Sequence, residues 1–141
     1  LVGLSNRLRG GACRPFNSDT KIRLRQPDRV RFYYPDVSVV CRPNPQDDTF
    51  QDRPVAVFEV ISNRTRRTDE GEKKDAYLSI PSLGIYVLVE PDAPALVAFR
   101  RSRKGFVRET PEGLNAVLRL PDVGCELPLA EIYEGVEHSR A

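Results

Sequence analysis

The segment from Val55 to Ile61 constrains the fold of this 141-residue chain more than any other. Its residues are apolar apart from Glu59, so it predicts a β-strand that is buried on both faces and holds a carboxylate. An unpaired, ionised carboxylate inside an apolar sheet is strongly unfavourable. We therefore expect Glu59 to be neutralised, paired with a cationic side chain or bound to a metal ion.

A second strand shows the same combination. The segment from Tyr34 to Cys41 is rich in β-branched residues and has Asp36 at its start. Two carboxylates on neighbouring strands indicate a divalent cation as their shared counter-ion. Because Asp36 follows Pro35, hydrogen bonding within a local turn is the structural alternative for this residue.

One helix is predicted from Asp69 to Ile80, before Pro81. Asp69 is a good N-cap, and Glu72 three residues later completes a capping pattern that also suits the helix dipole. As an N-cap, Asp69 is better explained by helix capping than by metal binding.

The helical phase turns Lys73 towards the core, on the face that also carries Ala76 and Tyr77, while Lys74 lies at its margin. An ammonium group here could approach Asp36 and Glu59. With a bound cation that polarises a phosphodiester and acidifies water, it would orient the nucleophile or stabilise negative charge. The structural alternatives are a lysine that reaches solvent or pairs with Glu59, and a Tyr77 that packs under the helix or bonds to Lys73.

The remaining pattern predicts one domain spanning residues 1–141, built mostly of strands. Further strands are expected at 20–24, 85–89, 96–101 and 106–109, and a proline-rich loop at 42–54 joins two neighbouring strands. The first 11 residues have apolar positions at 1, 4 and 8 and end in two glycines, which is typical of the end of an amphipathic helix. Since the chain has no methionine, we expect part of the N-terminus to be missing. No window approaches ~18 consecutive apolar residues, so no membrane span is expected.

Charge and cysteine usage add further expectations. The net charge of +2 does not by itself indicate a polyanionic partner. Arg64, Arg66 and Arg67 lie between Glu59 and the predicted helix, which favours contacts with phosphate, and residues 100–104 form a second basic cluster. The three cysteines, at positions 13, 41 and 125, are odd in number and widely spaced, which favours reduced thiols in a cytoplasmic protein.

Several segments occur in an order that is typical of one protein family. In chain order they are Pro35-Asp36, Glu59-Val60-Ile61-Ser62, Arg66-Arg67-Thr68-Asp69 leading to Lys73 and Tyr77, and Ile85-Tyr86-Val87-Leu88-Val89-Glu90-Pro91. With this combination the chain resembles the large bacterial Uma family of restriction endonucleases, within the PD-(D/E)XK nuclease superfamily. The resemblance covers nearly the whole chain, whereas Pro35-Asp36 alone would carry almost no weight.

The resemblance implies roles for individual residues. In the superfamily the aspartate of the PD element and the acidic residue of the (D/E)XK element bind the metal ion. These correspond to Asp36 and Glu59, with the backbone carbonyl of Val60 as a further ligand. The usual lysine two residues after the acid is absent, because Ile61 stands there. Family members place a lysine on the following helix instead, which corresponds to Lys73.

The resemblance also implies a restriction-endonuclease-like α/β fold, in which a central mixed β-sheet is flanked by helices, with the Lys73 helix on one face and the N-terminal helix against the sheet. It implies hydrolysis of DNA phosphodiester bonds by a homodimer, with Mg²⁺ as cofactor and Mn²⁺ as a substitute. Asp19 and Tyr77 are supporting candidates, and Gly84-Ile85 departs from the charged pair more frequent in the family. The alternatives are a catalytically silent DNA-binding or assembly module, and a nuclease acting on RNA or damaged single strands.

Overall fold

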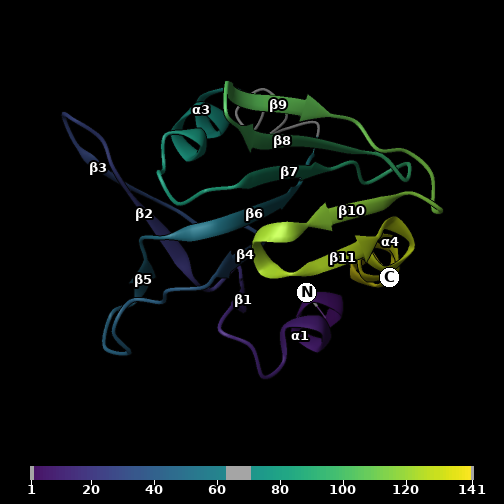
Figure 1. The fold of residues 1–141 in the computed structure, drawn as a ribbon, viewed down its shortest axis with the longest axis horizontal. Coiled ribbons are helices and arrows are strands. Elements are labelled where there is room, and N and C mark those ends of the chain that lie inside the picture. Colours follow the sequence, from purple (N-terminus) through teal and green to yellow (C-terminus); the bar gives the residue numbers. More distant parts are fainter. Residues whose placement is uncertain (1, 63–70, 141) are drawn as a thin grey trace.

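The computed structural model describes residues 2–62 and 71–140, and within them the side chains of residues 3–62 and 71–134. Its centre is a six-stranded sheet. In sheet order the strands are β1 (Arg14–Asn17), β4 (Val37–Val40), β6 (Pro54–Val60), β7 (Ile85–Val89), β8 (Leu96–Ser102) and β9 (Gly105–Glu109) (Figure 1). β6 and β7 run parallel, whereas the other neighbouring pairs are antiparallel. The expected mixed sheet with flanking helices is therefore confirmed.

The parallel pair β6 and β7 requires a crossover, and α3 (Glu72–Leu78) lies in it. The described part of this helix begins at Glu72, with Gly71 at its N-cap position, so the expected cap at Asp69 lies outside the described residues. The helix ends at Leu78 rather than at Ile80, because the N–H groups of Ser79 and Ile80 donate to carbonyls three residues earlier in a tighter turn.

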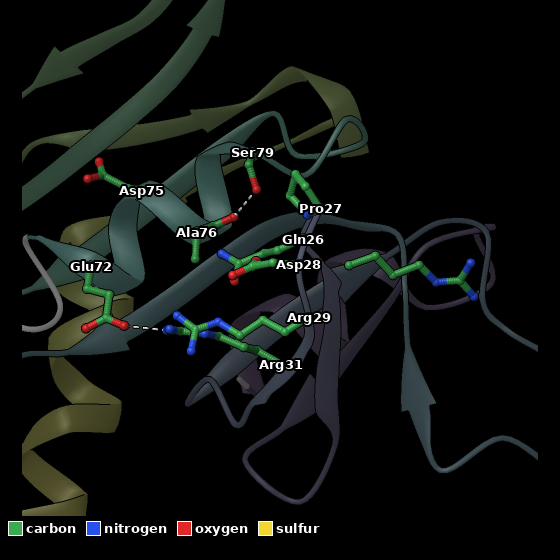
Figure 2. Close-up of a pocket in the computed structure, with 10 residues that line it drawn as sticks. Gln26, Pro27, Asp28, Arg29, Arg31, Glu72, Asp75, Ala76 and Ser79 are labelled. Carbon is green, nitrogen blue, oxygen red and sulfur yellow. Dashed lines mark hydrogen bonds and ion pairs between the residues drawn. The ribbon is translucent and has the colours of Figure 1, made fainter.

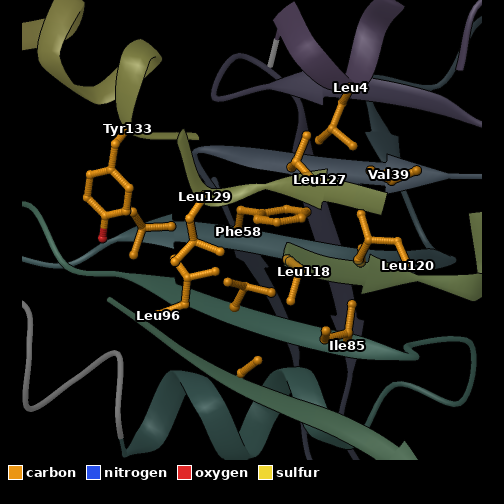
Figure 3. Packing of buried hydrophobic residues seen from close by; sticks show 14 of the residues in the cluster. Leu4, Val39, Phe58, Ile85, Leu96, Leu118, Leu120, Leu127, Leu129 and Tyr133 are labelled. Atoms are coloured by element: carbon orange, nitrogen blue, oxygen red, sulfur yellow. The ribbon is translucent and has the colours of Figure 1, made fainter. Parts of the chain in front are cut away.

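One face of the sheet is covered by apolar side chains from both ends of the chain. α1 (Val2–Leu8), β10 (Val117–Leu120), β11 (Cys125–Pro128) and α4 (Leu129–Arg140) pack on it, and the short 3₁₀ helix η1 (Pro121–Val123) joins β10 to β11 (Figure 3). The core here includes Leu4, Val39, Phe58, Ile85, Leu96, Leu118, Leu127, Leu129 and Tyr133. The expected N-terminal helix is present, and it is followed by Gly10 at a φ of 79°, a left-handed conformation that suits glycine.

The opposite face is covered by α3 and by β2 (Lys21–Arg25). Its buried residues include Ile22, Leu24, Val57, Ile61, Ala76, Tyr77, Leu83, Tyr86 and Leu88. Val57 and Phe58 therefore belong to different clusters, as strand alternation requires. The expectation that this segment is buried on both faces is confirmed.

A small three-stranded sheet extends from the large one, at the left of Figure 1. Its order is β3 (Val30–Tyr33), β2 and β5 (Phe50–Gln51). The hairpin between β2 and β3 closes at a turn in which Gln26 and Arg29 exchange backbone hydrogen bonds of 2.8 and 3.3 Å. β1, β3 and β5 were not expected from the sequence.

Cys13 and Cys41 form a disulfide, so the expectation of three reduced thiols is wrong for this pair. Arg14 pairs with Val40 in the antiparallel β1–β4 ladder, and one further step in this register brings Cys13 opposite Cys41. The sequence separation of 28 hides this proximity, while Cys125 is a free cysteine. Because the cytosol keeps most thiols reduced, cysteine usage gives no support to a cytoplasmic location.

Two further features bear on the sequence expectations. None of the helices among the described residues is long and apolar enough to cross a membrane. Gly84, the departure from the family pattern, lies against the side chain of Asp122, since a β-carbon at this position would come within 2.0 Å of a carboxylate oxygen. The absence of a side chain at position 84 thus matches the packing of β7 beside η1.

Candidate functional site

Glu59 lies near the end of β6 with its side chain on the α3 face, and it is only 4% exposed. The Tyr86 hydroxyl donates a hydrogen bond of 3.1 Å to Glu59 Oε2. The Lys73 ammonium lies 3.9 Å from the other carboxylate oxygen, Oε1. The buried carboxylate thus has a polar contact at each oxygen, which explains how an acidic residue is accommodated in an apolar strand.

Asp36 is exposed and immediately precedes β4. Its Oδ2 accepts a hydrogen bond of 2.8 Å from the backbone N–H of Val60, so this contact joins two strands and is not a local turn. Val37 pairs with Phe58, and one further step in the antiparallel register brings Asp36 opposite Glu59. Opposite residues of an antiparallel pair share a face and have β-carbons about 4.5–5.5 Å apart. The register therefore brings the two acidic residues together at the end of β6.

Lys73 reaches this place from α3. Besides its contact with Glu59, its ammonium lies 5.6 Å from the centre of the Tyr33 ring, and the side chain is 25% exposed. Lys74 points elsewhere, with its ammonium 3.9 Å from Asp75 and 4.9 Å from the Phe99 ring. The helical phase that the sequence predicts, with Lys73 directed towards Glu59, is confirmed.

Four aromatic rings form a continuous row next to Glu59 and Lys73. Tyr77 is fully buried, and its ring lies 5.4 Å from that of Tyr33 and 5.2 Å from that of Tyr86. Phe99 extends the row from the far side of Tyr86, at 6.5 Å. The packing alternative for Tyr77 is therefore observed. The row also holds Tyr86 in place, so that its hydroxyl can support Glu59.

Tyr86 and Tyr33 are residues that sequence reasoning did not assign to the site. Glu59 pairs with Leu88 in the parallel β6–β7 ladder, and Tyr86 lies two residues earlier on the same face of β7. Strand alternation places Tyr86 and Leu88 on one face of β7, and the sequence shows this. It points to Tyr86 as a neighbour of Glu59 only once the pairing of β6 with β7 is known. Tyr33 belongs to β3, which was not expected.

The donor types at the end of β6, two carboxylates and a backbone carbonyl, are ones that Mg²⁺ takes in proteins. No cluster of three or more His, Cys, Asp or Glu side chains that could hold a metal occurs in the described part of the chain. A cation at the end of β6 would therefore take the carboxylates of Asp36 and Glu59, the carbonyl of Val60 and water. Mg²⁺ commonly binds proteins in this way, through one or two carboxylates and several waters. These ligand assignments stay predictions.

Among the described residues, the remaining candidate, Asp19, is not joined to this group. Asp19 lies in an exposed turn after β1, where its backbone N–H donates to Asn17 Oδ1 at 2.9 Å. No hydrogen bond or ion pair of the described residues connects Asp19 to Glu59. The proposed phosphate contacts, Arg64, Arg66 and Arg67, lie outside the described residues.

A pocket of about 620 Å³ lies next to this group, between α3 and the turn of the β2–β3 hairpin (Figure 2). Its charged lining residues are Arg25, Asp28, Arg29, Arg31, Glu72 and Asp75. Arg31 forms an ion pair with Glu72 and donates a hydrogen bond of 3.0 Å to the Tyr33 hydroxyl. Arg25 lines the pocket from the end of β2, where strand alternation turns its side chain to the other face of the hairpin. The pocket contains none of the acidic residues at the end of β6.

Comparison with known proteins decides the family. The family model Uma2, described as "Putative restriction endonuclease", matches residues 2–130 of this chain. The chain belongs to the Uma2 family. An uncharacterised protein of Synechocystis sp. (strain PCC 6803), slr1290, is 31% identical to this Uma2 protein over 132 residues, which are 93% of this chain and 68% of the relative.

A solved structure shares the fold. The crystal structure of "a putative nuclease belonging to DUF820" from Anabaena variabilis superimposes with a TM-score of 0.69, over 95% of this chain and 74% of the other. The two sequences are 15% identical, so the comparison establishes the restriction-endonuclease-like fold of this Uma2 protein and nothing finer. The family description supports a nuclease role in general terms.

Proposed function

We propose that this Uma2 protein is a metal-dependent endonuclease that hydrolyses phosphodiester bonds in DNA. One observation carries the proposal: Asp36 and Glu59 occupy opposite register positions, and the Lys73 ammonium lies 3.9 Å from Glu59. The register and this contact support a site in which Asp36, just before β4, Glu59 on β6 and Lys73 on α3 act together at one end of the sheet. This donor set suits a divalent cation and a developing negative charge, which are the requirements of phosphodiester hydrolysis.

Each residue of the group has a separate role. Asp36 and Glu59 would hold Mg²⁺, with the Val60 carbonyl as a further ligand and Mn²⁺ as a substitute. The bound ion supplies Lewis acidity towards a phosphate oxygen and lowers the pKa of water. Lys73 would orient the attacking water or stabilise negative charge on the phosphate. Tyr86 is a positioning residue, since its hydrogen bond fixes one oxygen of Glu59 and directs the other towards Lys73.

Cleavage assays test the proposal. The wild-type protein should nick or linearise plasmid DNA in Mg²⁺ or Mn²⁺ and lose this activity in a chelator. Asp36→Asn, Glu59→Gln and Lys73→Met should each abolish it. Lys74→Met is the matched control, because Lys74 is the neighbouring lysine on α3 but contacts Asp75 and Phe99 instead. Equal activity of the Lys73 and Lys74 variants would overturn the assignment.

RNA and damaged single strands should be tested in the same cleavage assays, since a nuclease acting on them would use the same residues.

A catalytically silent DNA-binding or assembly module is the second candidate, and the contact between Lys73 and Glu59 is the observation in its favour. The pair could exist only to neutralise a buried carboxylate. However, 3.9 Å is longer than a hydrogen bond, so this contact is a Coulombic attraction without close pairing. A separation of this size is compatible with a cation entering beside Glu59.

Melting curves distinguish the two candidates. If Glu59 serves the metal ion, Glu59→Gln should leave the metal-free melting temperature close to that of the wild type, because Lys73 is 25% exposed and can reach solvent. The increase in melting temperature on adding Mn²⁺ should disappear. A silent module predicts the reverse: no response to Mn²⁺ in the wild type, and a loss of about 3–5 kcal/mol in Glu59→Gln, as expected when one partner of a buried pair is removed.

The assembly and the location are part of the proposal as well. Cutting both strands of a duplex with one kind of site calls for two copies, so we propose a homodimer, which light scattering at micromolar concentration would test. A strict monomer would count against it. We also propose a cytoplasmic location, which the Cys13–Cys41 disulfide opposes, because a reducing cytosol would keep both thiols free. Thiol titration of the freshly isolated protein tests the location: an intact disulfide would count against it.

A further inference from the structure

The small sheet presents basic side chains on the face turned away from α3. Ile22 and Leu24 of β2 are buried in the cluster beneath α3. Because side chains alternate along a strand, Lys21, Arg23 and Arg25 lie on the opposite face. This spacing of every second residue produces a basic row without a run of adjacent charges.

Two aromatic rings lie among these charges. The Lys21 ammonium is 4.8 Å from the centre of the Phe32 ring, and the Arg23 guanidinium is 4.1 Å from that of Phe50. The two rings meet edge to face, with their centres 6.0 Å apart. The four side chains form one surface across β3, β2 and β5, which we call the ring surface. Tyr34 follows β3 along the chain and Arg25 continues the basic row of β2, and we include both in the ring surface.

The ring surface is exposed and lies close along the chain to Asp36 of the candidate site. Phe32 is 44% exposed and Tyr34 is 57% exposed, which is unusual for large aromatic residues. Asp36 follows two residues after Tyr34 and is also exposed. Since an extended chain spans at most about 3.6 Å per residue, Phe32 lies within ~14 Å of Asp36.

The hairpin is strongly basic although the whole chain is nearly neutral. Residues 21–33 contain five basic residues and one acidic residue, a net charge of +4, compared with +2 for the whole chain. Arg23 pairs with Asp52 and Arg31 with Glu72. Lys21, Arg25 and Arg29 make no ion pair with the described residues. This charge is complementary to a polyanion.

We propose that the ring surface binds an unpaired strand of nucleic acid, with bases stacked on Phe32 and Tyr34 and phosphates neutralised by Lys21 and Arg25. Proteins that bind single strands combine aromatic stacking surfaces with basic side chains in this way. Paired bases are already stacked inside a duplex, so exposed rings distinguish an unpaired strand from a duplex. The proposal rests on the proposed nuclease function, because it supplies a route by which a strand reaches the candidate site.

Binding is measured without cleavage, in a chelator and in the Glu59→Gln background, by fluorescence anisotropy of a labelled oligothymidine and of a duplex of equal length. Phe32→Leu keeps an apolar side chain but removes the ring, and it should weaken oligothymidine binding by about tenfold or more. Duplex binding should hardly change. The double variant Lys21→Gln, Arg25→Gln should bind oligothymidine with a weaker salt dependence. The slope of the logarithm of the binding constant against the logarithm of the salt concentration should fall by about 0.7 for each phosphate that these side chains no longer neutralise.

The chain offers a matched control. Phe106 on β9 has the Arg101 guanidinium 4.5 Å from its ring centre, the same pairing at the edge of the large sheet. Phe106→Leu should bind oligothymidine as the parent does. The inference is overturned if Phe32→Leu binds like the parent, or if Phe106→Leu weakens binding equally.

The two proposals fail in different ways. If Phe32→Leu cleaves normally and binds the single strand as the parent does, the ring-surface proposal is wrong and the nuclease proposal stands. If Phe32→Leu binds the single strand more weakly but the wild type cleaves in no metal, the ring-surface proposal stands and the nuclease proposal is wrong. Circular dichroism of each variant checks that the exposed substitutions leave the fold intact.

Discussion

The two faces of the large sheet differ in the side chains that accompany their aliphatic residues. The face beneath α1, β10, β11 and α4 is packed with aliphatic side chains, together with Phe58 and Tyr133. The face beneath α3 holds the row of aromatic rings and the charged pair of Glu59 and Lys73. Neighbouring residues of β6, Phe58 and Glu59, belong to opposite faces.

The difference shows how one strand can serve stability and chemistry at once. Apolar burial on one face supplies free energy of folding, at about 25 cal/mol per Å². The other face can then hold a buried carboxylate, although its burial costs free energy, because packing on the first face already holds β6 in place. Substitutions on the first face should therefore affect folding, and substitutions on the second should affect activity.

The largest effect is expected on the apolar face. Phe58 is 6% exposed, and Phe58→Ala should lower the free energy of unfolding by about 3–5 kcal/mol, through reduced burial and the cavity left behind. Denaturant titration measures this, and cleavage per folded molecule should be retained. A decrease below about 1 kcal/mol would mean that this face contributes little to stability and that the two faces do not differ in this respect.

A pair of tyrosines gives a sharper contrast. The Tyr133 hydroxyl, on the apolar face, accepts from the Ala95 N–H at 3.0 Å and donates to the Glu90 carbonyl at 2.6 Å. Tyr86→Phe and Tyr133→Phe should each cost about 0.5–1.5 kcal/mol of stability, the usual contribution of a hydrogen bond. Only Tyr86→Phe should slow cleavage, by about tenfold, because its hydroxyl supports Glu59. Cleavage that slows equally in both variants would show that the effect is a general loss of stability.

The smallest effect is expected on the side of the small sheet that is turned away from the large sheet. Arg23 makes two hydrogen bonds of 2.7 Å to Asp52, and this holds the pKa of the Asp52 carboxyl below its ordinary value of 3.8. The stabilisation is therefore present above the ordinary pKa and is lost as the pH falls through the lower, folded value. Asp52→Asn should cost under about 1 kcal/mol at neutral pH, since the pair is partly exposed. Melting curves of both proteins against pH should converge in strong acid; a constant difference would exclude this linkage.

The central elements could be predicted from the sequence because local pattern and tertiary role agree there. The apolar run around Glu59 indicates a buried strand, and the helical phase of Lys73 is set by residues on its own helix. The pairing of Asp36 with Glu59 was expected because each of two apolar strands carries one carboxylate, and the family resemblance added the roles of the two residues. The register between β4 and β6 is consistent with that pairing.

The remainder depends on partners far apart in the chain. β5 has two residues and exists as a strand because it pairs with β2. The disulfide follows from the β1–β4 ladder, and the position of Tyr86 beneath Glu59 follows from the β6–β7 ladder. The basic row of β2 could not be recognised as a cluster in the sequence, because its charges alternate with buried residues and never stand side by side.

Ile61 stands where the nuclease superfamily usually has its lysine, and it is 1% exposed, within the apolar cluster under α3. Moving the lysine back to this position would place an ammonium group where the fold needs a hydrocarbon. Burial at this position therefore disfavours the usual motif, and under the proposed function Lys73 would supply the cation from α3 instead. A genome search that requires an acid and a lysine at fixed spacing would pass over such proteins, whereas one that asks which side chains meet at the strand end would find them.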